Sequence, residues 1–249
     1  MHETGRERRL AALRERIGGL ERTARPRPAL PLGIDAVDRH LPGGGLRLGA
    51  LHEVVEAGPS AGHAALAALF AGGLLARLPG PVLWCLAGRD LFAPGLAAVG
   101  LHPDRVLYAE TRREAEVLPT MEEGLRHGSL AAVVGEVARM GLTASRRLQL
   151  AAESGGALAL VIRRWRAGAD IEPSAAATRW CVTPAPSPAL PAAVPGLARS
   201  RWSLALLRAR GAEPRTWLVE APDAQGRLHL PADLADRPPA AQGRLSAAG

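Results

Sequence analysis

Short apolar runs, each followed by a longer helical stretch, recur between residues 48 and 165. The runs are LGALHEVVE, PVLWCLAG, RVLYAE, SLAAVVGEV and ALALVIRRW. Strands that are apolar along most of their length, rather than at every second residue, are typical of a parallel sheet covered by helices on both faces. The alternation therefore predicts an α/β fold with a mostly parallel, twisted sheet.

The longer helices are expected at residues 61–78, with Ser60 as the N-terminal cap, at 112–127, and at 143–154, with Thr143 as the cap. A shorter helix is expected within LFAPGLAAVG. Beyond residue 170 the helical patterns cease, and ATRWCVTP, RSRWSLALLRARG and RTWLVEAP predict strands separated by Pro- and Gly-rich turns. We expect these strands to add antiparallel neighbours to the sheet.

The two ends of the chain differ from this core. Near the start, four apolar residues recur at helical spacing among Arg and Glu: Leu10, Leu13, Ile17 and Leu20. They predict an amphipathic helix within residues 1–22, which either packs on its own domain or docks on a neighbouring protein. TARPRPALP indicates a linker at 23–31, and the core is expected over 32–234. Residues 235–249 have too few apolar side chains to pack and predict a flexible tail.

The charge balance excludes one group of mechanisms and favours one kind of partner. The chain has no lysine, so its 31 basic residues are all arginine, against 24 acidic residues. Lysine-dependent chemistry is excluded, although joint enrichment in Ala, Gly, Arg and Pro indicates a compositional bias as the origin. Between residues 135 and 215, 12 arginines face 5 acids. This surplus favours an acidic partner, either nucleic acid or an acidic protein.

The cysteines and the start of the chain bear on its location. Cys85 and Cys181 lie inside apolar runs without the spacing of metal ligands, which predicts structural thiols in a reducing compartment and no metal site. The N-terminal segment is charged from its third residue, unlike a signal peptide, and no apolar span is long enough for a membrane helix. We expect a cytoplasmic protein that does not contact membranes.

The stretch EAGPSAGHAAL, residues 56–66, has the spacing of a phosphate-binding loop. Such a loop reads G-x-x-x-x-G-K-[ST], because its backbone N–H groups hold phosphate, its Lys reaches the outer phosphates and its hydroxyl binds Mg²⁺. In that frame the chain has Ala57, Gly62, His63 and Ala64. The candidate loop residues, which form a degenerate nucleotide loop, are Gly58, Pro59, Ser60, Gly62, His63 and Ala64.

Residues 32–66 resemble the entrance of the RecA-type recombinase core. The matching positions are Gly33, Asp38, Gly43 to Gly45, Gly49, Glu53, Gly58, Pro59 and Gly62. Within that family, the chain resembles the ImuA family, the RecA-like accessory proteins of inducible bacterial mutagenesis. The charged N-terminal segment, the altered loop and the closing strands carry this second likeness. The resemblance implies a RecA-like core over about residues 30 to 220.

The elements of ATP hydrolysis are altered in this chain. A histidine is mostly neutral at pH 7, so His63 lacks the fixed charge of the loop lysine, and Ala64 has no metal ligand. The acid expected after LAAVV is Gly135, with Glu136 directly following, and the water-orienting glutamate falls near Gly88, where Asp90 is the nearest acid. We expect no catalysis and no cofactor. Backbone N–H groups at the start of the following helix leave anion binding open.

A basic cluster ends the run ALALVIRRW, at the strand end that the resemblance implies leads into a DNA-contacting loop. Its members are Arg163, Arg164, Trp165 and Arg166, with Arg146 and Arg147 as further candidates. Arginine suits phosphate and tryptophan suits base stacking, which predicts a platform for single-stranded DNA. The alternative is that these arginines cap strand ends and pair with acids such as Glu136 or Asp170, while Arg146 and Arg147 lie on a solvated helix face.

The resemblance implies a non-catalytic adaptor in the SOS response, acting in DNA-damage-induced translesion synthesis. Its implied partners are an ImuB-type polymerase-like hub, an error-prone polymerase alpha subunit, RecA and single-stranded DNA. Docking on a RecA-type neighbour is expected through the apolar stripe of the N-terminal helix. Two alternatives stay open: a DNA-stimulated RecA-like ATPase with unusual residues, and an SOS-type regulator of cell division.

Overall fold

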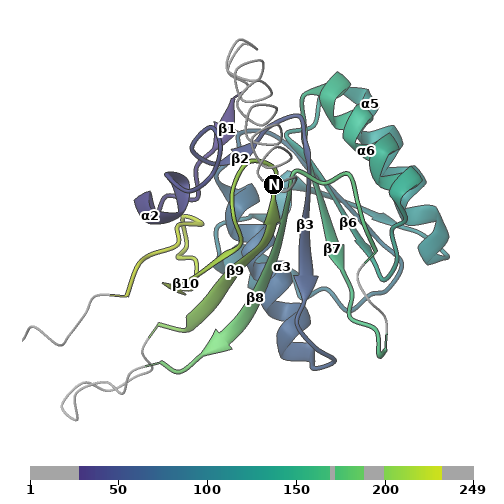
Figure 1. The fold of residues 1–249 in the computed structure, drawn as a ribbon. Helices are drawn as coiled ribbons and strands as arrows, with labels where there is room; N and C mark the ends of the chain where they lie inside the picture. The colour runs from purple at the N-terminus through teal and green to yellow at the C-terminus, as the bar shows by residue number, and fades with distance from the viewer. Residues whose placement is uncertain (1–27, 169–171, 188–198, 232–249) are drawn as a thin grey trace, which may run out of the picture.

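The computed structural model describes residues 28–168, 172–187 and 199–231. Figure 1 shows its helices and strands. In chain order they are β1 (Ala29–Leu30), α2 (Asp35–Asp38), β2 (Leu46–Arg47), β3 (Leu51–Glu56), α3 (Ala61–Ala76), β4 (Val82–Leu86), α4 (Ala93–Ala98), β5 (Val106–Glu110), α5 (Val117–His127), β6 (Ala132–Val137), α6 (Leu142–Gly155), β7 (Leu158–Arg163), β8 (Thr178–Ala185), β9 (Arg201–Ala209) and β10 (Arg215–Glu220).

The main sheet has eight strands in the order β10-β9-β8-β3-β7-β6-β4-β5. Strands β3 to β8 run parallel to one another, whereas β9 and β10 are antiparallel to their neighbours. The mostly parallel sheet with added antiparallel strands is therefore confirmed. One strand differs from the expectation, since β8 pairs parallel to β3 and only then does the chain reverse.

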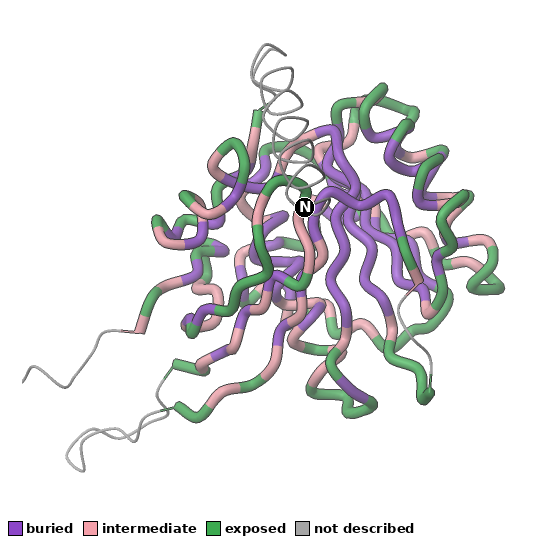
Figure 2. Tube along the Cα trace, in the orientation of Figure 1, coloured by how far each residue is buried: buried purple, intermediate pink, exposed green. Residues whose placement is uncertain are grey.

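Helices cover the two faces of the sheet. Side chains of α3 pack with Val54, Trp84 and Trp180 in one core, and side chains of α5 and α6 pack with Leu51 and Val161 in the other. In Figure 1, α5 and α6 lie together along one side of the sheet, and Figure 2 shows the central strands as buried tubes between exposed outer segments. Strands β3, β6 and β7 are buried almost throughout, as their apolar sequence predicts.

A small two-stranded sheet precedes the main one and was not expected. Strands β1 and β2 pair antiparallel, so the predicted linker at 23–31 reaches into ordered structure, and the core begins before residue 32. Gly45 is required here, because a Cβ atom at this position would overlap the carbonyl oxygen of Leu30. The carboxylate of Asp38 closes the same segment by accepting hydrogen bonds from the backbone N–H groups of Leu32 (2.6 Å) and Gly33 (2.9 Å).

The starts of two helices differ from their predictions. Helix α6 begins at Leu142 with Gly141 in the cap position, so Thr143 lies inside the helix and is not its cap. Helix α5 begins at Val117, later than expected, because a single 3-10 turn precedes it. Helix α3 does start after Ser60, but the Ser60 hydroxyl makes no capping hydrogen bond to the backbone.

Several expectations concern residues outside the described ranges. The stripe of Leu10, Leu13, Ile17 and Leu20 and the tail at 235–249 lie there, and both stay predictions. Within the described part of the chain, no helix is long and apolar enough to cross a membrane, and no side-chain cluster is suited to a metal ion. Cys85 is buried, which raises the pKa of its thiol to about 12 and makes it unreactive.

Candidate functional site

The degenerate loop lies between the carboxyl end of β3 and the first turn of α3. Its histidine turns back over its own loop: the Nδ1 atom of His63 lies 3.2 Å from the Ser60 hydroxyl. A Cβ atom built on Gly58 would lie only 2.8 Å from the same nitrogen, so the imidazole lies directly against the Gly58 backbone. His63 therefore contacts the loop rather than extending from it as a phosphate-binding lysine must.

The backbone of this loop also departs from that of an anion-binding loop. A concave anion site is built from successive N–H groups in alternating right- and left-handed conformations. Every positive φ angle in the described part of the chain belongs to a glycine outside residues 57–64. Gly58 and Gly62 thus do not have positive φ angles, and the loop lacks the left-handed residues of such a concavity. What the loop retains is the N-terminal turn of the 16-residue helix α3.

The carboxyl ends of the parallel strands meet beside the loop, the edge at which open α/β sheets bind their ligands. There the guanidinium of Arg164, just after β7, pairs with three carboxylates. It lies 3.4 Å from Glu56 and 3.1 Å from Glu136, and it also pairs with Asp90. These four side chains form what we call the crevice cluster. The backbone N–H of Trp165 donates to Glu56 as well (2.8 Å).

Glu136 is the most strongly held member of the crevice cluster. The indole N–H of the buried Trp84 donates to its carboxylate at 2.7 Å. Burial raises the pKa of Glu136, opposed by the Trp84 hydrogen bond and the charge of Arg164. For Arg164 burial alone would lower the pKa, but the attraction of Glu136, Asp90 and Glu56 raises it overall. The cluster is thus a charged group whose members are already satisfied by each other.

The position of Glu136 corrects one step of the sequence interpretation. The spacing predicts an acid at the position of Gly135, but this residue faces α5, where an added Cβ would overlap the Sδ of Met121. Glu136 is the residue of β6 that faces the crevice. A carboxylate is therefore present at this strand end, and what distinguishes the site is that Arg164 and Trp84 occupy it. Asp90 likewise lies in the crevice, paired with Arg164.

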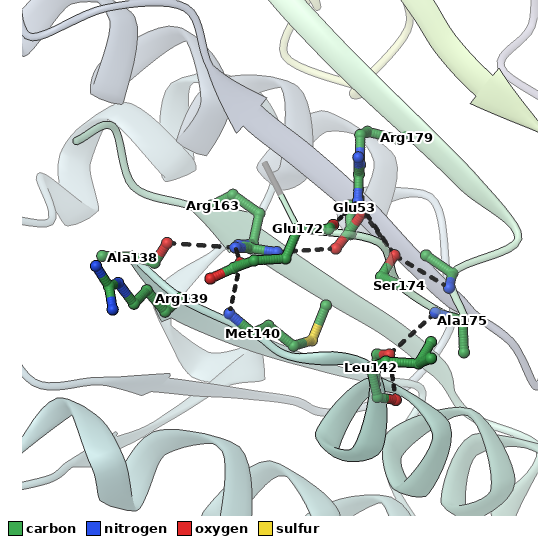
Figure 3. A network of polar contacts seen from close by, with 12 residues as sticks. Glu53, Ala138, Arg139, Met140, Leu142, Arg163, Glu172, Ser174, Ala175 and Arg179 are labelled. Carbon is green, nitrogen blue, oxygen red and sulfur yellow. Dashed lines mark hydrogen bonds and ion pairs between the residues drawn. The ribbon is translucent and has the colours of Figure 1, made fainter. Parts of the chain in front are cut away.

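A second polar network lies on the opposite face of the sheet, around the fully buried Glu53 of β3 (Figure 3). Its carboxylate accepts from Arg163 (3.3 Å), Arg179 (2.6 Å) and the hydroxyl of Ser174 (3.0 Å). Arg163 also pairs with Glu172. This Glu53 network joins β3, β7 and β8 to the segment that enters β8, and it holds that segment in place.

The structure separates the six predicted DNA-contacting residues. Arg163 is wrong as a DNA contact, because its side chain is only 5% exposed and is paired with Glu53. Arg164 is held inside the crevice cluster, as the alternative interpretation proposed for Glu136, whereas Asp170 lies outside the described residues. Arg147 pairs with Glu122 at 2.7 Å. Within the described part of the chain, three candidates are exposed and form no salt bridge: Trp165, Arg166 and Arg146.

Comparison with curated proteins decides the family. The chain is 39% identical over 233 residues to "Protein ImuA" of Caulobacter vibrioides strain NA1000 / CB15N, a match that covers 88% of this chain and 95% of that protein. The chain belongs to the ImuA family. "Protein ImuA" of a second Caulobacter vibrioides strain, ATCC 19089 / CIP 103742 / CB 15, matches with the same identity and coverage. No family model matches the chain.

Among solved structures, this ImuA-family chain is similar to the crystal structure of the RadB recombinase. The two superpose with a TM-score of 0.53 at 16% identity, over 82% of this chain and 100% of that one. At this identity the likeness shows the fold alone, and that fold is RecA-like. The predicted RecA-like core is confirmed.

The Glu53 network was missed by the sequence interpretation. Glu53 stands in the run LHEVVE, between His52 and Val54, and an acid within a fully buried strand needs a charged or polar partner. That pattern was a usable signal, because Arg163 and Arg179 also stand in strands that the sequence identified. The network is structural, since its buried groups contact one another.

Proposed function

We propose that this ImuA-family chain is a non-catalytic adaptor in DNA-damage-induced mutagenesis, built on a RecA-like core that has given up its nucleotide site. The observation that carries the proposal is the crevice cluster. Arg164 engages Glu56, Glu136 and Asp90, the carboxylates at the edge where a metal-bound phosphate would have to lie. A bound nucleotide would have to displace a cation that three carboxylates hold.

The loop supports the same proposal independently. His63 lies against Gly58 instead of extending, Ala64 offers no metal ligand, and no residue of the loop is left-handed. Loss of one positioned electrostatic group commonly lowers a rate by about 10²-fold to 10³-fold. With the charge and the metal ligand absent, this loop lacks the groups that stabilise the transition state of hydrolysis in a phosphate-binding loop.

Membership of the ImuA family supports the partners that the sequence implied. We propose that the chain connects an ImuB-type polymerase-like hub and an error-prone polymerase alpha subunit to RecA or to single-stranded DNA. Trp165, 41% exposed, and the exposed Arg166 are the proposed DNA contacts, because both follow the strand end directly and neither is buried. They offer a stacking surface and a phosphate ligand side by side.

Partner capture tests the adaptor function. The tagged full-length protein is purified from damage-treated cells of its own species, and its companions are identified by mass spectrometry. Recovery of the polymerase-like hub, with the error-prone polymerase or RecA, is expected. Recovery of none of these would contradict the adaptor role. Recovery of the cell-division machinery instead would favour the alternative of an SOS-type regulator of cell division.

A further inference from the structure

The outward face of α6 carries apolar and basic side chains in one stripe. Leu142, Arg146 and Leu150 are spaced four residues apart, which places them on the same side of the helix. The opposite side packs on the sheet through Leu148 and Ala152. Leu142 is 41% exposed and Leu150 is 64% exposed, so two leucines of one helix face are left in solvent.

Two hollows lie on either side of Leu150. One, of about 410 Å³, is lined by Leu142, Arg146, Leu150 and Arg210, with Ser174 and Ala175. The other, of about 300 Å³, lies between α5 and α6 and is lined by Arg126, Arg147 and Leu150, together with Glu122, Ala151 and Ser154. Leu150 is therefore a ridge between two hollows that each combine apolar and arginine side chains. We call this surface the α6 ridge.

The charge of the α6 ridge is not balanced by its own acids. Within the described residues, neither Arg146 nor Arg210 forms an ion pair with an acidic side chain, and both are exposed. Arg210 is held in position, since its Nη2 donates to the carbonyl oxygen of Ala175 at 2.6 Å. Arg146 and Arg210 thus line one hollow without a counterion from the described chain, and the backbone holds Arg210 in position.

The acids beside Arg146 and Arg210 are already paired with other arginines. Glu122 pairs with Arg126 (2.5 Å) and with Arg147 (2.7 Å), and Glu153 pairs with Arg47 (3.5 Å). The positive surplus at Arg146 and Arg210 is therefore available to a partner.

We propose that the α6 ridge binds an acidic amphipathic helix of another protein, with apolar side chains in the two hollows and carboxylates against Arg146 and Arg210. A protein segment fits better than nucleic acid, because leucines flank the arginines and no aromatic side chain lines either hollow. The chain's own residues 1–22 fit poorly, since their six arginines exceed their four glutamates. This surface lies on α6 and does not depend on the crevice or on the partners proposed above.

A peptide-binding assay with the full-length protein tests the proposal. Three labelled helical peptides carry the same three leucines at helical spacing. The residues around these leucines are acidic in the first peptide, basic in the second, and a scrambled mixture of the two in the third. Fluorescence anisotropy is measured at near-physiological ionic strength for the unaltered protein, for Leu150→Glu and for Arg146→Glu/Arg210→Glu. Leu230→Glu, at a leucine that is 52% exposed away from α6, is the matched control.

The acidic peptide is expected to bind at least tenfold more tightly than the basic and scrambled peptides. Leu150→Glu and the double arginine variant should each weaken that binding at least tenfold, with Leu230→Glu unchanged and all circular dichroism spectra alike. Equal binding by the unaltered and α6 variants would overturn the proposal. Competition by oligothymidylate that depends on Arg146 would also overturn the proposal, because it would mark a nucleic-acid surface. Self-association that Leu150→Glu abolishes would do the same, because it would mark a second copy of the chain as the occupant.

Discussion

Arg163 and Arg164 are adjacent in the chain, yet their side chains lie on opposite faces of the sheet. Arg163 pairs with Glu53, on the face covered by α5 and α6, and Arg164 pairs with Glu56 and Glu136 in the crevice. Successive side chains of a strand point to opposite faces, so one dipeptide contributes to both networks. Arg163 thus belongs to the buried Glu53 network on one face of the sheet, and Arg164 belongs to the crevice cluster at the carboxyl ends of the strands.

The Glu53 network is expected to matter for stability. Glu53→Ala leaves Arg163 and Arg179 buried without their shared carboxylate, and breaking a buried pair costs about 3 to 5 kcal/mol. Urea unfolding should show a loss of that size. The control is Glu110→Ala, which removes an exposed pair with Arg89 (side chains 47% and 85% exposed) and should cost less than about 1 kcal/mol. Equal losses in the two variants would show that the network is not stabilising.

His52 should make the stability depend on pH. Its Nε2 lies 2.9 Å from the carbonyl oxygen of Arg47 and its Nδ1 lies 2.8 Å from the hydroxyl of Thr178, and burial lowers its pKa to about 4. Between pH 6.5 and 4, His52 is protonated in the unfolded chain but stays neutral in the folded protein. The contribution of His52 to the free energy of unfolding is therefore complete above pH 6.5. It decreases as the pH falls, by about 2 kcal/mol at pH 5.

The measurement is the free energy of unfolding at pH 7 and at pH 5 for the unaltered protein and for His52→Gln. The glutamine does not titrate, so the loss on acidification should be smaller in the variant by about 2 kcal/mol. An identical pH dependence in both proteins would show that His52 is not the titrating group.

Gly135→Ala tests the packing between β6 and α5. The added methyl group would overlap the Sδ of the fully buried Met121 and would also lie 2.8 Å from its Cγ and 3.2 Å from a methyl group of Val117. Overpacking of this kind costs about 1 to 3 kcal/mol. Gly62→Ala is the control, because its methyl group meets only the Ser60 hydroxyl at 3.6 Å and should cost nothing. An unchanged melting temperature for Gly135→Ala would contradict the described contact.

Much of the fold could be predicted because its strands are buried on both faces. A run such as SLAAVVGEV has no polar face that could be mistaken for a surface. Helices α5 and α6 have apolar periodicity, whereas α3 is apolar on all sides and was predicted from its length and small residues. The two-stranded sheet of β1 and β2 was missed because strands of two residues have no period to detect. The parallel direction of β8 was missed because sequence patterns report strands but not their direction.

The site was harder to predict because its chemistry depends on side-chain direction. The sequence predicts one basic cluster from Arg163 to Arg166, although the alternation of side chains along a strand separates Arg163 from Arg164. The loop substitutions at His63 and Ala64 could be identified from spacing alone. The position of the His63 ring against Gly58 and the pairing of Arg164 with Asp90, 74 residues away, required the folded chain.

DNA binding should depend on Trp165 and Arg166, the exposed residues that follow β7. Trp165→Ala is expected to weaken binding of oligothymidylate about tenfold, since one base stack is worth about 1 to 3 kcal/mol. Arg166→Ala should reduce the salt dependence by about one phosphate contact. Arg39→Ala, at a side chain that is 81% exposed, serves as the control. Anisotropy titrations over a range of salt concentrations in which Trp165→Ala and Arg166→Ala match the unaltered protein would rule out this surface.

The RecA-like core is predicted not to hydrolyse ATP, and the measurement is steady-state turnover with and without single-stranded DNA. The unaltered protein, His63→Ala and His63→Lys/Ala64→Thr are compared. All three are predicted to give the same background rate, because Arg164 still holds Glu56, Glu136 and Asp90 when the loop is restored. DNA-stimulated turnover by the unaltered protein that disappears in His63→Ala would contradict the account.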